Sequence, residues 1–501
     1  ELWKSDGTSS GTVMVQDINS GGSSDPQLFT AVGNTLYFRA KDGTYGHELW
    51  ALDPANITGL GGGSGSGSSS SSAIAYTNDK LDSGIYFTCA ILENGDLKCW
   101  GSDGHGQLGI GGYTGDQNVH PQINSPSSTP IDLGSGRTAV SVDTGQYHAC
   151  AILDNGDVKC WGRDAHGQLG DGGATPTHYT SSGNPLRDIP SASIDLGSGR
   201  TAVAISAGAE HTCAILDNGD LKCWGSSFVG QLGYGIFAGT HSQYNLTSPP
   251  SNPVNLGAGR TAVAVSAGHA HTCAILDNGD LKCWGYDNKG QLGNSSKVTT
   301  GTPPSAPIDL GTGRTAVAVS AGEYHTCAIL DNGDLKCWGD DSKGQLGNGP
   351  SITADQYPPS STPIDLGSGR TAVAVSAGEK YTCAILDNGD LKCWGWDYDN
   401  KLGTGSPASD TDAPSSTPID LGTGRTAVAI NGYRHSCAIL DNGDLKCWGQ
   451  NTYGQLGNGG SNANNDIPGL VVGNNIWDSS TTPSSIIPVT GATCTVSPAL
   501  P

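Results

Sequence analysis

The chain has 501 residues, with 25 Lys+Arg against 47 Asp+Glu, which gives a formal net charge of −22 although only 14% of residues are charged. Such an acidic chain lacks the clustered cations that neutralise phosphates, so we expect no nucleic-acid partner, and no apolar run approaches the roughly 18 residues that a membrane helix requires. An ordinary apolar share with modest charge density favours a folded protein over a disordered one.

Residues 1–60 are expected to form part of a β repeat. The string Glu-Leu-Trp occurs at residues 1–3 and again at 48–50, and the segment 32–38 between them is predicted as a strand. This pattern resembles the ELWxxDGT repeats of bacterial and archaeal surface proteins. The chain starts without Met or a signal sequence, so we expect it to be a segment of a longer protein. The Gly/Ser tract at residues 61–72 is typical of a flexible linker.

A 13-residue string, CAILDNGDLKCWG or a close variant, occurs seven times within residues 73–478. Successive copies lie 61, 63, 60, 54, 56 and 54 residues apart. Each copy continues to a GQLG-like tetrad, which is degenerate (NKLG) in the sixth copy at residues 400–403, and six copies follow a segment similar to IDLGSGRTAVAVSAG. A period of roughly 50–60 residues indicates a solenoid, an array or a propeller.

The local sequence of the repeat favours a propeller. The segments TAVAVSAG, HTCAIL and DLKCWG are short, rich in β-branched or aromatic residues and bounded by Gly or Asn-Gly, and no segment shows helical periodicity. With PIDL as a fourth candidate strand, each unit from the second onward has the content of one propeller blade. We therefore predict an all-β fold, a seven-bladed β-propeller of four-stranded blades.

The two cysteines of each copy fix the register of the hairpin between them. A two-residue Asn-Gly turn would set Cys150 opposite Trp161 and send the two sulfurs to opposite faces. A three-residue loop at 154–156 with a left-handed glycine and a G1 bulge instead pairs Cys150 with Cys160, within the range of Cα separations that a disulfide accepts. Two thiols separated by nine residues make a poor zinc site, and no CxxC knuckle is present, so we expect no metal and no other cofactor.

This register predicts one disulfide in each blade. The expected pairs are Cys89 with Cys99, Cys150 with Cys160, Cys213 with Cys223, Cys273 with Cys283, Cys327 with Cys337, Cys383 with Cys393, and Cys437 with Cys447. Seven cystines persist only where thiols are not continually reduced, so we expect an extracellular or cell-surface protein. Three N-glycosylation sequons, at Asn56, Asn245 and Asn294, are weak support for this compartment.

The pattern GxxHxCAxLxxGxxxxWGxxxxGQLG, as at residues 322–347, resembles the regulator of chromosome condensation repeat. The resemblance implies a seven-bladed propeller in which the first and last segments share a blade. It does not fix a function, because the family includes a nuclear exchange factor for a small GTPase and a secreted inhibitor of β-lactamase. The cystines, the acidity and the lack of a basic tail argue against exchange-factor activity and chromatin binding here.

Several recurrent residues have both a functional and a structural interpretation. Imidazoles recur two positions before the first cysteine, at His148, His211, His271, His325 and His435, where other copies have Phe87 and Tyr381. A ring of histidines facing the axis would serve metal binding or general base catalysis, but a position that accepts Phe or Tyr is more simply a packing position. The tryptophan after the second cysteine is expected to be core, since it occupies every copy. The recurrent Arg of GRT is interpreted as an exposed turn cation, with pairing to carboxylates as the alternative, and the Asp-Asn-Gly-Asp motif as a turn rather than a calcium loop.

The copies differ most in the insertions between GQLG and the next IDLG, and the three longest are residues 110–130, 171–193 and 234–253. Loops on a rigid scaffold commonly carry binding residues, with solvated spacers as the alternative. The candidate binding rim consists of Tyr113, His120, His178, Tyr179, Phe237 and Tyr244.

The C-terminal part raises the question of ring closure. The first blade, entering with residues 76–83, has no PIDLG segment and lacks one strand by this count, while residues 466–473 form an apolar run with no Cys pair of their own. We expect residues 466–473 to complete the first blade and remove its open edge. Residues 479–501 resemble the start of an immunoglobulin-like module, and Cys494 has no evident partner.

We therefore expect a non-enzymatic, extracellular or surface-attached propeller that binds a protein or a glycan within a larger repeat protein. The alternatives are a secreted inhibitor that caps a partner protein, and a polysaccharide-active enzyme with its site in the central funnel.

Overall fold

The structure is a computed structural model that describes residues 79–111, 122–173, 192–235, 245–349, 355–405, 409–461 and 464–472, together with strands at 2–4, 13–16, 27–32, 35–41, 47–52, 178–179 and 185–187. The chain divides into two compact units, residues 1–74 and 75–501. No helix among these described residues is long and apolar enough to cross a membrane.

The first unit contains two small antiparallel sheets. Strand β1 (Leu2–Lys4) pairs with β2 (Val13–Gln16), and β3 (Gln27–Val32), β4 (Thr35–Lys41) and β5 (His47–Leu52) form a three-stranded meander. The prediction of a single strand over residues 32–38 was wrong, because Val32 ends β3 and pairs with Thr35 at the start of β4. The run belongs to two adjacent strands.

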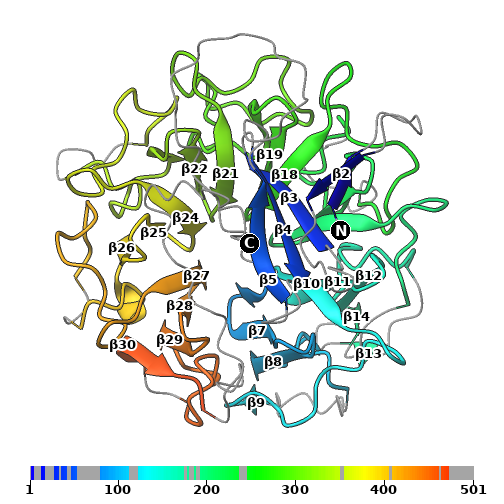
Figure 1. Ribbon diagram of the computed structural model, residues 1–501, viewed down its shortest axis with the longest axis horizontal. Coiled ribbons are helices and arrows are strands. Elements are labelled where there is room, and N and C mark those ends of the chain that lie inside the picture. Colours follow the sequence, from blue (N-terminus) through cyan, green and yellow to red (C-terminus); the bar gives the residue numbers. More distant parts are fainter. Residues whose placement is uncertain are drawn as a thin grey trace, which may run out of the picture. The chain divides into compact units, whose positions relative to one another are not determined.

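Seven antiparallel sheets follow one another around the second unit, and the sequence colours of Figure 1 run once around the ring. Blades one to three contain β6 (Leu81–Ser83), β7 (Phe87–Ile91), β8 (Leu97–Ser102) and β9 (Gln122–Ile123); β10 (Ala139–Thr144), β11 (His148–Leu153), β12 (Val158–Arg163), β13 (His178–Tyr179) and β14 (Pro185–Arg187); and β15 (Ala202–Ala207), β16 (His211–Leu216) and β17 (Leu221–Gly225).

The remaining four blades have the same order from the axis outward. They contain β18 (Ala262–Ala267), β19 (His271–Leu276) and β20 (Leu281–Gly285); β21 (Ala316–Ala321), β22 (His325–Leu330) and β23 (Leu335–Gly339); β24 (Ala372–Ala377), β25 (Tyr381–Leu386) and β26 (Leu391–Gly395), followed by a 3₁₀ turn, η3 (Tyr398–Asn400); and β27 (Ala427–Gly432), β28 (His435–Leu440), β29 (Leu445–Gly449) and β30 (Asn465–Leu470). The predicted fold class, an all-β seven-bladed propeller, is confirmed.

The central hairpin of each blade has the predicted register. In blade two, Leu153 N–H donates to the Asp157 carbonyl, and Gly156, at φ +81°, closes the three-residue turn. Cys150 lies directly opposite Cys160, with Cα atoms 4.1 Å apart. All seven predicted disulfides are present. The cross-strand sulfurs therefore belong to the buried framework of the blades.

The PIDL segments are not the fourth strands, so that part of the prediction was wrong. Ile131 donates one backbone hydrogen bond to Leu97, and the Ile131 and Leu133 side chains pack between blades one and two. In four blades the outermost position is instead taken by a single bridge to an insertion loop, as between Gly225 and Leu246. The apolar pair in PIDL packs against the neighbouring blade and leaves the sheet edge to the insertion.

Seven buried clusters fill the seams between blades, one cluster to each seam. A tryptophan lies fully buried in every seam. In the seam between blades three and four, Trp284 Nε1–H donates to the Gln231 carbonyl of the previous blade at 3.0 Å, and its ring lies where a Cβ on Gly233 would clash. The GQLG tetrad therefore forms one side of the site in which the tryptophan of the next blade packs.

The expected completion of blade one by residues 466–473 was also wrong. Strand β30 pairs with β29, so it extends blade seven, and blade one has its own innermost strand, β6. Because PIDL is not a strand in any blade, blade one is not one strand short, and the described ends of the ring share no sheet.

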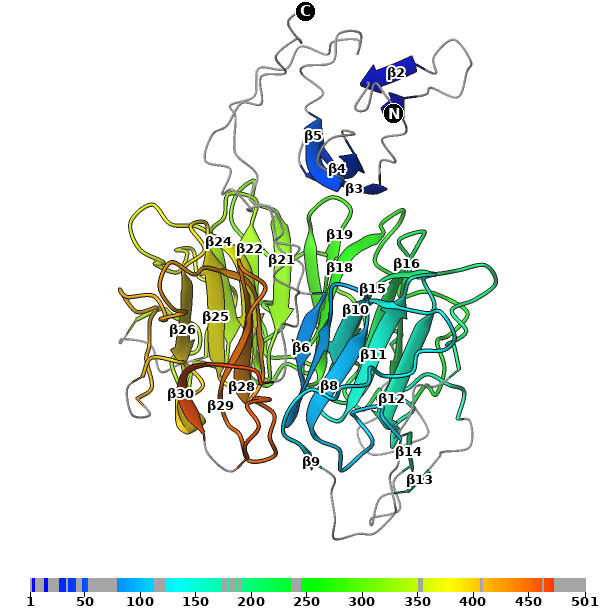
Figure 2. The same ribbon diagram turned by 60° about the horizontal axis from the view of Figure 1, so that its bottom comes forward.

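The ring closes by packing between whole blades. Val471 is buried with Leu81 and Trp100 of blade one, and Trp100 Nε1–H donates to the Gln455 carbonyl of blade seven at 3.0 Å. Figure 2 shows β6 and β28 beside each other at this seam.

Candidate interaction face

The recurrent histidines lie in the seams and join neighbouring blades. His211 Nε2 lies 2.9 Å from Thr272 Oγ1 of the next blade, and all five histidines are fully buried. Thr272 donates its only hydroxyl proton to the Gln231 carbonyl, so it must accept from an Nε2–H of His211. The other four pairs are His148–Thr212, His271–Thr326, His325–Thr382 and His435–Thr88.

Burial keeps these imidazoles neutral. It lowers the pKa of His148, His211, His271 and His435 to about 3, and that of His325 to about 4. Among the described residues, no group of three or more His, Cys, Asp or Glu side chains is placed to hold a metal ion. The geometry assigns these histidines to the scaffold, where each carries one inter-blade hydrogen bond.

The two copies without histidine carry matching changes in the next blade. Phe87 cannot donate a hydrogen bond, and the same buried cluster contains Ala149 of blade two, at the position where other copies have Thr or Ser. Tyr381 is longer than histidine, and its hydroxyl lies 2.9 Å from the smaller Ser436 of blade seven. The residue at the histidine position and the residue that faces it in the next blade therefore change together, as expected of positions that serve packing.

One face of the ring repeats the same residues blade after blade. It carries the Asp-Asn-Gly turns and the GRT loops, and we call it the repeated face. The GRT arginines are about 36–40% exposed, and each pairs with the turn aspartate of its own blade at 3.1–3.5 Å: Arg137–Asp154, Arg200–Asp217, Arg260–Asp277, Arg314–Asp331, Arg370–Asp387 and Arg425–Asp441. These arginines are thus exposed cations of the turns, as the sequence predicted. They also pair with carboxylates, which was the alternative interpretation.

The opposite face is built from two short turns in each blade whose sequences differ from copy to copy, and we call it the variable face. The first turn contributes residues 85–86, 146–147, 209–210, 269–270, 323–324, 379–380 and 433–434; the second contributes 102–105, 163–166, 226–229, 286–289, 340–343, 396–399 and 450–453. In six blades a backbone hydrogen bond joins the two turns, as from Tyr286 N–H to the Ala270 carbonyl at 2.9 Å.

A repeated polar network holds the second turn, so that its variable side chains are free to differ. In blade five the Asp341 carboxylate accepts Leu346 N–H, and Gln345 Oε1 accepts Lys343 N–H. Burial raises the pKa of Asp341 to about 7. The Asp recurs in five copies and the Gln in six, and these two residues satisfy the backbone of the turn, while the side chains between them differ from copy to copy.

Aromatic side chains are frequent on the variable face. Partly or largely exposed rings come from Tyr86, Tyr147, Phe228, Tyr286, Tyr324, Trp396, Tyr398, Tyr433 and Tyr453. Large rigid rings and arginine are the residues that most often dominate the energy of protein interfaces. Sequence reasoning missed this face, although its signal is present: the differences between copies recur at the same two turns.

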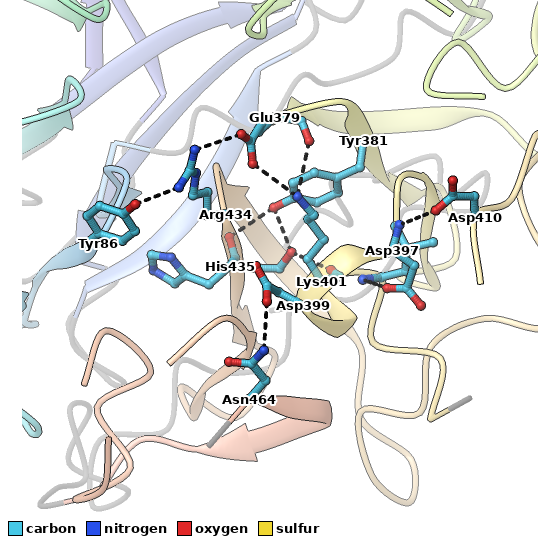
Figure 3. A network of polar contacts seen from close by, with 12 residues as sticks. Tyr86, Glu379, Tyr381, Asp397, Asp399, Lys401, Asp410, Arg434, His435 and Asn464 are labelled. Atoms are coloured by element: carbon cyan, nitrogen blue, oxygen red, sulfur yellow. Dashed lines mark hydrogen bonds and ion pairs between the residues drawn. The ribbon is translucent and has the colours of Figure 1, made fainter. Parts of the chain in front are cut away.

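The degenerate sixth copy carries the most elaborate network of this face (Figure 3). Lys401, at the position of the tetrad glutamine, is fully buried, with its Nζ 3.3 Å from Glu379 Oε2 and 4.2 Å from the centre of the Trp396 ring. Arg434 of blade seven joins Glu379 to the Tyr86 hydroxyl of blade one. Burial lowers the pKa of Lys401, and the nearby Glu379 opposes that shift.

The same copy carries local backbone strain. Lys380, Asp399 and Asn400 are the only non-glycine residues with positive φ among those described, at 57°, 70° and 61°. Asn400 occupies the position that is glycine in the other tetrads, where Asn is the best tolerated substitute. Tyr398 stacks on Trp396 with ring centres 5.2 Å apart and is 61% exposed.

Two hollows open near the axis of the ring. The axial cavity, of about 110 Å³, is lined by equivalent residues of the innermost strands: Asp82, Asp143, Ser206, Ser266, Ser320, Ser376 and Asn431. Burial raises the pKa of Asp82 to about 6 and, reinforced by the Asp82 charge, raises that of Asp143 well above its usual range. A larger hollow of about 470 Å³ lies on the variable face between blades two and four.

Most of the predicted binding rim lies outside the residues that the structure describes. Tyr113, His120, Phe237 and Tyr244 lie outside the described residues, and of His178 and Tyr179 only the backbone, in β13, is described. The rim stays a prediction, as does the module over residues 479–501, which also lies outside the described residues.

These observations define a disulfide-stapled, seven-bladed propeller with one repeated and one variable face. A family model described as the RCC1-like domain matches residues 177–485, and a model of the RCC1 repeat matches residues 79–107 and 139–168. The chain belongs to the RCC1-like family.

Among curated proteins, the Arabidopsis thaliana ultraviolet-B receptor UVR8 is 29% identical over 386 residues, which cover 76% of this chain and 79% of the receptor. The Homo sapiens E3 ubiquitin-protein ligase HERC2 is 28% identical over 373 residues, and the match spans only 7% of that ligase. The mitochondrial RCC1 domain-containing protein RUG3 of Arabidopsis thaliana is 32% identical over 311 residues, or 59% of this chain and 66% of RUG3.

Solved structures agree on the fold. A chain in the crystal structure of Kap60 bound to yeast RCC1 (Prp20) superimposes with a TM-score of 0.64 at 20% identity, over 83% of this chain and 91% of that chain. Human WBSCR16 superimposes with a TM-score of 0.61 at 20% identity, over 75% and 93% of the two chains.

Proposed function

We propose that this protein is a non-enzymatic binding propeller that holds a protein partner on its variable face, outside the reducing compartments of the cell. The observation that carries the proposal is the contrast between the faces. Seven similar copies differ at the same two turns, and there they present partly or largely exposed aromatic rings. Prp20p of Saccharomyces cerevisiae, whose structure has a similar fold, is described as binding Gsp1p and histones, and this supports a protein as the class of partner.

The compartment is proposed from the cystines. Seven disulfides whose cysteines are at most 3% exposed belong to the folding framework, and such pairs persist in oxidising surroundings. Mass measurement after alkylation without reductant, on protein isolated from its own cells, tests this: oxidised pairs are expected, and free thiols would contradict the proposal.

An enzyme of the central funnel has less support. The histidines it would need lie in the seams, and the axial cavity of about 110 Å³ is smaller than the roughly 300–1,000 Å³ of usual ligand pockets.

The proposal is tested with the full chain on an array of purified extracellular proteins and glycans. A variable-face variant carries Tyr147→Ala, Tyr286→Ala, Tyr324→Ala and Tyr398→Ala, and the matched repeated-face control carries Arg200→Ala, Arg260→Ala, Arg314→Ala and Arg370→Ala. We expect a protein ligand that binds the wild type and the control but at least about tenfold more weakly to the variable-face variant, a loss of about 1.4 kcal/mol or more. Binding lost only in the control, or a glycan as the sole ligand, would overturn it.

A further inference from the structure

The hollow of about 470 Å³ on the variable face falls within the roughly 300–1,000 Å³ range of ligand-binding pockets. Its lining comes from three consecutive blades and includes Ala209, Glu210, Ser226, Phe228, Val229 and Ala270. It adjoins the axial cavity, with which it shares Gln146, Ala209 and His269.

The hollow exists because small residues stand at positions that are bulky in other copies. Ala270 occupies the second position of the first turn, where blades one, two and five have tyrosine. Ser226 occupies the first position of the second turn, where blade four has Tyr286 and blade six has Trp396. The same backbone framework is therefore filled by a ring elsewhere and left open here.

The walls combine apolar surface with a neutralised polar edge. Phe228, which is 52% exposed, and Val229 stand at positions that are polar or small in most other copies, with Tyr398 and Tyr453 as the exceptions. The Glu210 carboxylate is 3.2 Å from both Arg163 Nη1 and His166 Nε2. The basic groups of His166 and Arg163 lower the pKa of Glu210 against the effect of its burial, so it is held ionised and already paired.

Such a pocket suits a flat, uncharged group with an apolar body and a polar tip. A charged guest would have to displace Arg163 or His166 from Glu210, whereas an indole or phenol buries its ring against the Phe228 side and keeps a donor for Gln146, Asn245 or His269 on the lining. We infer that this pocket receives a tryptophan or tyrosine side chain of the protein partner. The inference rests on the proposed function, and it adds that one aromatic side chain of the partner is anchored in this pocket.

The test fills the pocket with the residue that other blades already carry. Ala270→Tyr copies the tyrosine of blades one, two and five, so the backbone tolerates it and the melting temperature should stay near that of the wild type. Ser342→Tyr is the matched control, since it adds a tyrosine on the same face at an exposed position that is Tyr398 in blade six.

The probe is N-acetyl-L-tryptophan amide, titrated against the full chain by saturation-transfer NMR. We expect saturable binding to the wild type and to Ser342→Tyr, in the roughly millimolar range of a fragment, and at least about tenfold weaker binding to Ala270→Tyr. Equal binding to Ala270→Tyr, no saturable binding to the wild type, or binding of methyl β-D-glucopyranoside in place of the indole would overturn the inference.

The two proposals fail in different ways. If the variable-face variant loses the partner found on the array but Ala270→Tyr still binds it, the face binds the partner and the inference that the pocket receives an anchor side chain is wrong. If neither variant changes partner binding, the proposed function fails, whatever the probe does.

Discussion

The two faces of the propeller are built from the same seven copies, yet they differ in what the copies keep. On the repeated face, the Asp-Asn-Gly turn and the GRT loop recur nearly unchanged, and each arginine pairs with the aspartate of its own blade. On the variable face, the backbone contacts recur but the displayed side chains do not. Positions that recur are explained by hydrogen bonds and packing, so the positions that vary are the ones left for recognition.

The comparison teaches that repetition alone does not mark a site. The histidines recur in five copies, and the sequence leaves metal binding or catalysis as an alternative to packing, but each imidazole bonds to a threonine of the next blade. Of the residues of the sixth copy that break the pattern, Lys401 lies in the network of the variable face, and Asn400 precedes it with a positive φ. Four experiments test whether the residues that hold the fold together can be separated from the side chains presented on the variable face.

Removing the disulfides should have the largest effect, because it attacks the framework under both faces. Each closes a loop of about 11 residues and contributes roughly 2–3 kcal/mol, so seven together contribute about 14–21 kcal/mol, which equals or exceeds the upper end of the roughly 5–15 kcal/mol net stability usual for a domain. We expect protein that is reduced in denaturant and alkylated to stay unfolded after dilution, as measured by circular dichroism, whereas the oxidised protein refolds. Native spectra from the alkylated chain would contradict this.

Two aromatic residues separated by one glycine sharpen the contrast between framework and display. Trp284 is fully buried in a seam, and its truncation to Ala should cost about 3–5 kcal/mol. Tyr286 lies on the variable face, and Tyr286→Ala should change stability by roughly 0.5 kcal/mol or less. Urea unfolding of both variants measures the difference. Similar losses would show that the variable face is itself part of the core.

The sequence predicts the blade better than it predicts the ring. The hairpin and its disulfide follow from local rules, because a one-residue shift would send Cys150 and Cys160 to opposite faces. The role of PIDL does not follow, because an apolar pair such as Ile131 and Leu133 suits a strand and a seam equally well. That ambiguity produced the error at ring closure, since a strand count that included PIDL left blade one short.

The candidate face could have been found in part. Differences between copies locate its turns, but the pocket depends on which turns meet across blades, and that depends on the ring. Ala209 and Ala270 are 61 residues apart and carry no signal of a shared hollow until blades three and four are side by side.

A seam exchange tests the structural reading of the histidines with an effect of intermediate size. The double variant His211→Phe with Thr272→Ala reproduces the Phe87–Ala149 pairing of the first seam. At pH 7 we expect a cost of roughly 0.5–1.5 kcal/mol, because both partners of the His211–Thr272 hydrogen bond are removed together, and the Gln231 carbonyl that loses the Thr272 hydroxyl still accepts Trp284 Nε1–H.

The acid range should reverse the order of stability. The pKa of His211 is about 3 when folded and 6.5 in its ordinary state, so its neutral form supports folding above pH 6.5, and that support is lost as the pH falls toward 3, at roughly 1.4 kcal/mol per pH unit. Buried carboxyls with raised pKa, such as Asp341, act in the opposite sense but are common to both proteins. Below about pH 5 the double variant should therefore be the more stable in urea unfolding. A constant difference from pH 7 to pH 4 would contradict the assignment.

The smallest effect is expected for the arginines of the repeated face, and it decides why they recur. Arg260 is 3.3 Å from Asp277, and the two side chains are 37% and 36% exposed, so Arg260→Ala should cost only about 0.2–1 kcal/mol and lose that effect in high salt. Asp277 also accepts Thr261 N–H at 3.2 Å, so Asp277→Ala should cost more, roughly 1–2 kcal/mol, and the excess should survive salt. A double-mutant cycle in low and high salt separates the energy of the ion pair from that of the turn.

If the turn carries most of the energy, the aspartate recurs because the backbone of the turn requires it, and the arginine recurs as its exposed partner. A cost for Arg260→Ala that equals that of Asp277→Ala and resists salt would instead make the arginine part of the framework and weaken the division between the two faces.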